Sequence, residues 1–125
     1  MIYSFTELKV WQEASNLRKE IEILSKSFPS EEKYRLTDQI IRASRSITNN
    51  IAEGFGRFHY QENIQFCRQA RGSLFEVLDH LLIAMDNKFI TKENFENLKI
   101  KFENELKLIN GYIKYLRDKK IEDKS

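Results

Sequence analysis

Residues 36–57 read LTDQIIRASRSITNNIAEGFGR, and the spacing of their apolar side chains indicates a helix. At about 100° per residue, one line along this helix is entirely apolar. It consists of Leu36, Ile40, Ala43, Ile47 and Ile51. Such a line is the stripe that an amphipathic helix buries against its neighbours. The segment is therefore predicted to be one helix of a helical bundle.

A polar flank runs beside the apolar line on the same predicted helix. It holds Gln39, Ser46, Asn50 and Glu53. Polar groups are costly to bury without partners, so one interpretation is a buried hydrogen-bond network that fixes the register of the helices. The alternative is a ligand or nucleic-acid site built on the same residues.

Further round the helix, three arginines form a basic stripe. The rigid, multi-donor guanidinium group suits phosphate recognition, so these residues and three later arginines are candidates for phosphate contacts. The alternative is a set of solvated charges or of ion pairs between subunits. The candidate set is Arg35, Arg42, Arg45, Arg57, Arg68 and Arg71.

The rest of the chain repeats the helical pattern three times, which predicts an all-α, antiparallel up-down-up-down four-helix bundle. The helices are expected at about residues 5–27, 31–55, 60–86 and 92–118, in a single domain of residues 1–125 with a frayed, charged tail at 119–125. Apolar stripes beyond those that one bundle buries suggest that copies of the chain associate.

Local signals mark the predicted helix ends. Ser4 and Glu7 form a capping box, and Ser30 and Thr91 are expected to cap the second and fourth helices. Gly56 is expected in the left-handed conformation after the second helix. Gly72, inside the third helix, predicts a close approach of another helix.

Length and composition exclude several classes of protein. Hydrophobic residues make up 41% and charged residues 32% of the 125 residues, with one proline and four glycines. This balance excludes general disorder and favours helices. No signal peptide and no long apolar run is present, so a cytoplasmic protein without membrane segments is expected. The net charge of +2 is too small to indicate nucleic acid by itself.

No constellation for catalysis or metal binding is evident. Ferritin-like sites need inward Glu-x-x-His pairs on facing helices, and this chain has two histidines, of which His80 stands four residues after Glu76. His80 is expected at the surface or at a subunit contact. Cys67 lies on the apolar line of the third helix, where a buried hydrophobe is the expected role. We therefore expect no enzyme activity, no cofactor and no metal.

One set of residues resembles a known family. The strings Gln39-Ile40-Ile41-Arg42-Ala43, Ser46-Ile47 and Asn50-Ile51-Ala52-Glu53-Gly54, followed by Arg57, look like the signature of a bacterial four-helix-bundle family. Its members are often encoded by intervening sequences inserted in 23S ribosomal RNA genes. The resemblance extends from about residue 5 to residue 118.

This resemblance implies a four-helix bundle, assembly into a ring-like homopentamer and association with nucleic acid. A related group serves as accessory subunits of retroelement reverse transcriptases, and the family has no assigned catalytic residue. The first hypothesis is therefore a non-enzymatic oligomeric bundle that binds structured RNA or DNA through a basic helix face. The second is an interaction scaffold whose partner is another protein.

Overall fold

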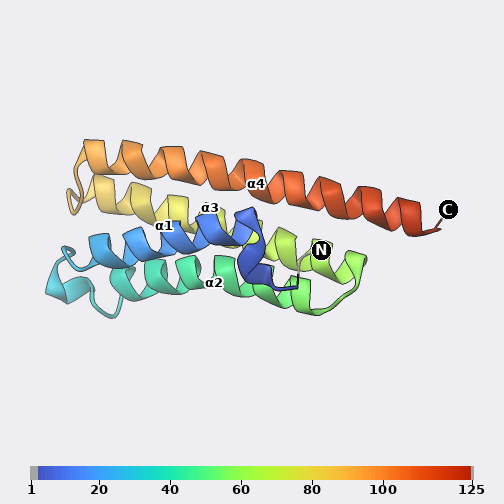
Figure 1. The fold of residues 1–125 in the computed structure, drawn as a ribbon. Coiled ribbons are helices and arrows are strands. Elements are labelled where there is room, and N and C mark those ends of the chain that lie inside the picture. The colour runs from blue at the N-terminus through green and yellow to red at the C-terminus, as the bar shows by residue number, and fades with distance from the viewer. Residues whose placement is uncertain (1–2, 125) are drawn as a thin grey trace.

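The computed structural model describes residues 3–124, which form four long helices and two short 3-10 turns. Each helix runs antiparallel to the next, and α1 lies beside α4, which closes the bundle (Figure 1). This confirms the predicted all-α, up-down four-helix bundle. The elements are η1 (Phe5–Glu7), α1 (Lys9–Ser25), η2 (Ser30–Glu32), α2 (Leu36–Gly56), α3 (Tyr60–Asp86) and α4 (Lys92–Lys124).

The predicted apolar line of α2 forms the centre of the core. All five of its side chains are buried, none more than 6% exposed. α3 buries two lines of side chains because it contacts both α2 and α4. The second of these lines contributes Ala70, Val77 and Ala84, all fully buried. Their small size lets neighbouring helices pack closely.

The first predicted helix is divided in two. The capping box is present, with Glu7 Oε2 accepting from the backbone N–H of Ser4 at 3.1 Å, but it caps the short turn η1. Leu8 then adopts an extended conformation (φ −76°, ψ 128°) and interrupts the helical hydrogen bonds. α1 therefore begins at Lys9, and the prediction of one helix from residue 5 was wrong.

The second helix begins later than predicted. Ser30 does not cap it; instead, Lys33 N–H bonds to Ser30 O in the 3-10 turn η2. Arg35 has non-helical backbone angles (φ −120°, ψ −108°), so α2 starts at Leu36, whose N–H lies 3.3 Å from Glu32 Oε2. Thr91 does cap α4, accepting from the N–H of Asn94 at 3.0 Å.

The glycines act at positions other than those predicted. Gly56 is helical, and Phe58 takes the left-handed conformation (φ 53°) after α2. Gly72 has open space around it, whereas a Cβ on Gly54 would lie 2.7 Å from Asn63 Oδ1 and 2.9 Å from Phe66 Cβ. The close approach of two helices is therefore between α2 and α3, at Gly54.

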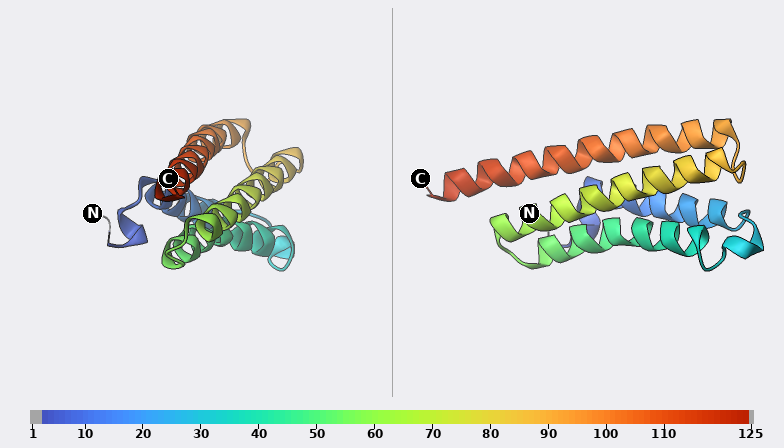
Figure 2. Two further views of the ribbon diagram at one scale, coloured as in Figure 1. Left: turned by 90° about the vertical axis from the view of Figure 1, so that its right-hand side faces the viewer. Right: turned by 180° about the vertical axis from the view of Figure 1, so that it is seen from behind.

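α4 is longer than predicted. It continues to Lys124 and projects past the start of α3 (Figure 2). The expected fraying after residue 118 was wrong, because side-chain contacts hold this part of the helix. Lys120 Nζ donates to Gln61 Oε1 on α3 at 2.6 Å, and Lys119 pairs with Glu122 at 3.2 Å. No helix among the described residues is both long and apolar enough to cross a membrane.

Candidate functional site

The basic stripe of α2 consists of Arg35, Arg42 and Arg45, and all three are exposed. Arg42 Nε lies 3.0 Å from Asp38 Oδ2, one turn earlier on the same helix. Arg45 Nε lies 3.1 Å from Glu22 Oε1 on α1. Of the three, only Arg35 has no ion pair with a described residue. Neighbouring carboxylates thus reduce the positive potential that this stripe offers to a phosphate.

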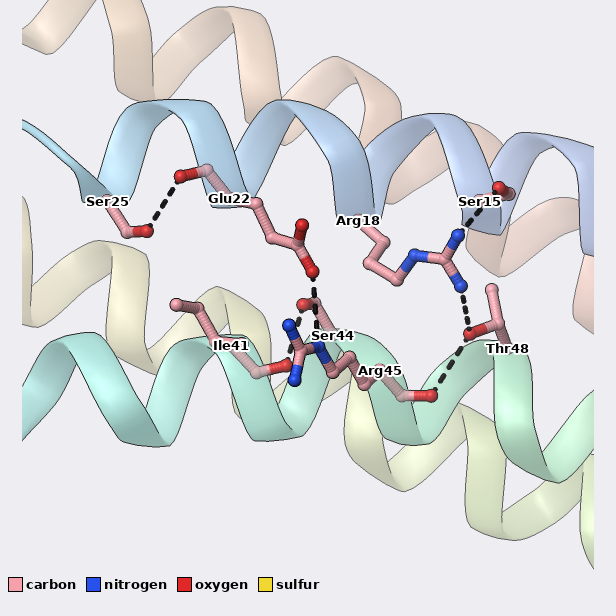
Figure 3. A network of polar contacts seen from close by, with 8 residues as sticks. All are labelled: Ser15, Arg18, Glu22, Ser25, Ile41, Ser44, Arg45 and Thr48. Carbon is pink, nitrogen blue, oxygen red and sulfur yellow. Dashed lines mark hydrogen bonds and ion pairs between the residues drawn. The ribbon is translucent and has the colours of Figure 1, made fainter.

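The partner of Arg45 belongs to a wider set of contacts between α1 and α2 (Figure 3). Arg18 on α1 donates to Thr48 Oγ1 at 3.0 Å and to Ser15 Oγ at 3.2 Å. Thr48 Oγ1 in turn donates to the carbonyl of Arg45 at 3.0 Å. The Arg18–Thr48 hydrogen bond and the Arg45–Glu22 ion pair join the two helices, so the polar residues here contribute to the packing of the bundle.

Two further candidate arginines also have partners. Arg57 Nη2 lies 3.1 Å from Glu53 Oε1, and the guanidinium carbon lies 5.1 Å from the centre of the Phe66 ring on α3, a cation–π distance. Arg71 Nη1 donates to Asn110 Oδ1 on α4 at 2.8 Å. Both arginines therefore link neighbouring helices.

The polar flank of α2 is only partly brought together. Ser46 Oγ lies 2.8 Å from Ser73 Oγ on α3, and Asn50 Nδ2 donates to the carbonyl and to Oγ of Ser46 at 2.9 and 3.0 Å. This half-buried group joins α2 to α3. Gln39 and Glu53 are exposed and take no part in it. The predicted four-residue network is thus reduced to Ser46 and Asn50, with Ser73 added.

Arg68 is in a different environment. It is exposed on α3 and, with Arg117 and Lys120 of α4, surrounds a hollow of about 320 Å³. No carboxylate lines this hollow among the described residues, and neither Arg68 nor Arg117 has an ion pair with one of them. We call these three residues the cationic cluster. The complete lining is Gln61, Ile64, Arg68, Arg117, Lys120 and Ile121.

Sequence reasoning missed Lys120 because it ended the fourth helix at residue 118. Arg117 lay inside that predicted helix but far along the chain from the arginines that made up the candidate set. The signal was present in the spacing of the chain. Ile113 and Leu116 are buried on α4, and one further turn brings Lys120 to the same side of the helix as Leu116. Extending the helical pattern by one turn would have placed Lys120 against α3.

Burial raises the pKa of two further ionisable groups well above their ordinary values. Desolvation raises the pKa of the Cys67 thiol to about 12, which fits a packing role. Desolvation also raises the pKa of the Glu105 carboxyl to about 9, and Glu13 on α1 adds to this shift. Glu105 is 1% exposed, and neither of its oxygens has a hydrogen-bond partner among the described residues.

Glu105 was also missed from the sequence. It lies three residues after Phe102 and four before Ile109, so it occupies a position on the buried line of α4. A charged residue type at such a position is the signal for a buried, neutral acid.

His80 is buried, contrary to the expected surface or subunit-contact position. Its exposure is 8%, and its Nε2 lies 3.4 Å from Glu76 Oε2. Among the described residues, no three His, Cys, Asp or Glu side chains converge in a way that would hold a metal ion.

Comparison with known proteins places the chain in a family. The family described as 23S rRNA-intervening sequence protein matches residues 6–111. The chain belongs to this family. No curated protein matches it in sequence. A crystal structure from Bacteroides thetaiotaomicron, of a protein with unknown function from the S23 ribosomal protein family, is 24% identical with a TM-score of 0.77. The likeness covers 84% of this chain and 98% of that one, and it shows the shared fold.

Membership of the 23S rRNA-intervening sequence protein family covers α1 to α3 and most of α4. Arg68 of the cationic cluster lies within the matched residues, whereas Arg117 and Lys120 lie beyond them. The basic stripe of α2 lies entirely within the match. The family match therefore includes all of the basic stripe and only part of the cationic cluster, and the geometry of this chain has to distinguish between them.

Proposed function

We propose that this protein binds structured RNA or DNA through phosphate contacts made by the cationic cluster. The observation that supports this most strongly is the convergence of Arg68, Arg117 and Lys120 from two helices on one hollow without a lining carboxylate. Arginine groups without ion-pair partners keep their donors available for phosphate oxygens. Basic groups of this kind supply most of the affinity of sequence-independent nucleic-acid binding.

The cationic cluster lies on α3 and α4, whereas most of the phosphate contacts predicted from the sequence lie on the basic stripe of α2 and just after it. In the basic stripe of α2, a phosphate would compete with Asp38 for Arg42 and with Glu22 for Arg45. In the cationic cluster, no carboxylate among the described residues pairs with Arg68 or Arg117, and Lys120 is bound to the neutral amide of Gln61. Arg35 is the member of the stripe that remains available to extend a contact surface.

The test is an electrophoretic mobility shift with an RNA hairpin, duplex DNA and an unrelated RNA. The variant R68Q/R117Q removes two charges from the cluster, and R42Q/R45Q removes the same number from the stripe. We expect at least a tenfold loss of affinity in the cluster variant and a smaller loss in the stripe variant. Equal losses, or a larger loss in the stripe variant, would refute the assignment to the cluster.

A protein-interaction role is the second candidate, and it is supported by two exposed isoleucines beside a groove between α1 and α4, whose lining also includes Glu20 and Lys101. Ile23 on α1 is 67% exposed and Ile100 on α4 is 66% exposed, beside hollows of about 620 and 600 Å³. Exposed apolar patches of this kind mark protein contacts. We propose that copies of the chain meet at this groove in a homo-oligomer, with a pentamer as the expected size.

Mass measurement by light scattering tests this assembly. We expect the variant I23E/I100E to shift the mass toward that of a single chain, because each charge would be buried in the contact. The matched variant Y34E/I121E also places two glutamates on exposed apolar residues, but away from the groove. A mass that is unchanged in I23E/I100E would exclude the groove as the contact.

A further inference from the structure

A second hollow at the same end of the bundle is lined mainly by aromatic rings. It has a volume of about 690 Å³ and lies between the turn after α2, the start of α3 and the last third of α4. This size is in the range of small-molecule sites. We call it the aromatic hollow. Its lining is Leu8, Phe55, Phe58, His59, Tyr60, Asn63, Tyr112, Tyr115 and Leu116.

Phe58 combines two unfavourable features. Its φ of 53° is an unusual backbone conformation for a bulky residue, and its side chain is 88% exposed. The positive φ occurs where α2 ends, a position usually filled by glycine. Packing does not explain the exposure of the side chain, since the ring paired with it, that of Phe55, lies 6.3 Å away between centroids. Strain of this kind is typical of functional positions. It holds an aromatic ring in solvent at the rim of the hollow.

The other rings supply a stacking surface, and nearby groups supply hydrogen bonds. Tyr112 and Tyr115 are nearly parallel, with an interplanar angle of 9° and centroids 6.2 Å apart, and Tyr115 is 53% exposed. Asn63 Nδ2 donates to Tyr112 Oη at 3.2 Å. Burial raises the pKa of Tyr112, so its hydroxyl stays protonated and keeps a proton to donate. Planar rings with a few polar groups suit a flat, heteroaromatic ligand.

The aromatic hollow and the cationic cluster lie on two flanks of one helix contact. On α3, Tyr60 and Asn63 line the aromatic hollow, whereas Arg68 lines the other. On α4, Tyr115 lines the aromatic hollow and Arg117 lines the hollow of the cationic cluster. A hollow lined by rings and a hollow lined by cations therefore lie on opposite sides of the contact between α3 and α4, at the same end of the bundle. Proteins bind unpaired nucleotides with bases on aromatic rings and phosphates on cations, and a strand that passes over the end of this contact would meet both.

The charges at the rim of the aromatic hollow are mixed. Arg57 contributes a cation but is paired with Glu53 and, at 3.8 Å, with Glu62. Lys119 lies 5.9 Å from the centre of the Tyr115 ring, and Asp123 faces Tyr60. The net attraction for phosphates therefore comes from the neighbouring cluster, and the hollow itself contributes ring contacts.

We infer that the aromatic hollow binds an unpaired nucleobase of the nucleic acid whose phosphates contact the cationic cluster. This inference rests on the proposed function. Phe58 and Tyr115 provide the exposed rings, and the Tyr112 hydroxyl provides a hydrogen-bond donor to the edge of the base. The ligand class is a looped or single-stranded segment, since a paired base is already stacked in its own helix.

The experiment uses an RNA hairpin with the fluorescent base 2-aminopurine in its loop, titrated with the full chain. Stacking quenches this base, so the intact protein should quench it on binding. Phe58→Gly should abolish most of the quenching and weaken binding about 5- to 100-fold, the range for loss of one stacked base. Its melting temperature should be unchanged or higher, because glycine accepts the left-handed conformation.

Two control variants separate stacking from other effects. Lys88→Gly relieves the second positive φ, 62° at the end of α3, away from the hollow, and should bind and quench as the intact protein does. Tyr115→Leu keeps an apolar side chain but removes a ring. It should reduce quenching, whereas a purely apolar docking site would tolerate it.

The outcomes distinguish this inference from the proposed function. If R68Q/R117Q weakens hairpin binding but Phe58→Gly leaves both quenching and affinity intact, the phosphate site stands and the base site is refuted. A fall in the mass of the oligomer on Phe58→Gly would also refute it, since a second copy of the chain would then occupy the hollow. If the intact protein does not bind the hairpin at low salt, both proposals are refuted.

Discussion

The contact between α1 and α2 differs from the surfaces of α4 in how charged side chains are used. Between α1 and α2, Arg18 and Glu22 each have a partner on the opposite helix. On α4, the carboxyl group of Glu105 is buried without a hydrogen bond, and Arg117 is exposed without an ion pair among the described residues. A charged residue whose partner lies on another helix joins the two helices. Burial of a charged group without a partner costs stability, and an exposed charge without a partner stays available to a ligand.

This difference shows why counting arginines along one helix misplaces a phosphate site. α2 carries a clear basic stripe in sequence, but its carboxylate partners come from its own previous turn and from α1. The cationic cluster draws its members from two helices far apart in the chain, Arg68 from α3 and Arg117 with Lys120 from α4. Availability for a ligand is a property of the assembled surface.

The largest expected effect on stability comes from Glu105. Its folded-state pKa of about 9 lies above the ordinary value of 4.5, so the folded chain keeps a proton that the unfolded chain releases. Stability from this group is therefore lost as pH rises from about 4.5 to about 9. Glu105→Leu should raise the free energy of unfolding by up to about 3 kcal/mol at pH 7, at roughly 1.4 kcal/mol per pKa unit.

Urea unfolding at pH 4.5, 7 and 9 measures this effect. The gain from Glu105→Leu should be small at pH 4.5 and larger at pH 7 and pH 9. Glu103→Leu, an exposed position on the same helix, is the matched control and should show no such trend. A gain in Glu105→Leu that does not change with pH would contradict a neutral, buried carboxyl.

A smaller change, and one in the opposite direction, is expected at the contact between α2 and α3, where a substitution at Gly54 should lower the free energy of unfolding. Gly54→Ala would bring a methyl group to 2.9 Å from Phe66 Cβ, an atom that cannot move without its helix. Overpacking of this kind costs about 1–3 kcal/mol. Gly72→Ala, with nothing within 4 Å, should instead be neutral or stabilise by up to about 1 kcal/mol. Thermal unfolding distinguishes them, and equal effects would contradict the packing described here.

The sequence predicts those features of the fold that depend on local spacing and chemistry, but not those that depend on how two helices meet. The apolar lines, the helix order and the Thr91 cap follow from spacing and local chemistry, and the structure confirms them. Spacing does not predict the close approach at Gly54 or the left-handed conformation of Phe58, because both depend on how α3 meets α2. In a sequence, Gly56 and Gly72 are equally good candidates for those roles.

The candidate site was less predictable than the fold. Arg68 was among the predicted phosphate contacts, but its neighbours Arg117 and Lys120 were not. The approach of Arg117 to Arg68 depends on how α3 packs against α4, and the position of Lys120 depends on a helix end held by contacts such as that of Lys120 with Gln61. The ion pair of Arg45 with Glu22 joins helices whose relative rotation no local pattern determines. The sequence therefore identifies charged residues on each helix but does not determine which of them pair.

The smallest expected effects compare Arg18, which has a partner on α2, with Arg117, which has no ion pair among the described residues. Arg18→Met should lower the free energy of unfolding by about 1 kcal/mol, because it removes a half-buried hydrogen bond to Thr48 on α2 and another to Ser15 on α1. Arg117→Met removes an exposed arginine and should change stability by no more than about 0.5 kcal/mol. Chemical unfolding of both variants makes the comparison. A larger loss in Arg117→Met would mean that the cationic cluster has a structural role.

The salt dependence of RNA binding tests whether phosphates contact the cationic cluster or the basic stripe of α2. The logarithm of the binding constant should fall linearly with the logarithm of salt concentration, and each lost phosphate contact should reduce the slope by about 0.7 to 0.9. We predict that R68Q/R117Q reduces the slope by between about 1.4 and 1.8, with R42Q/R45Q nearly unchanged. A slope reduced only in R42Q/R45Q would place the phosphate contacts on α2 and contradict this account.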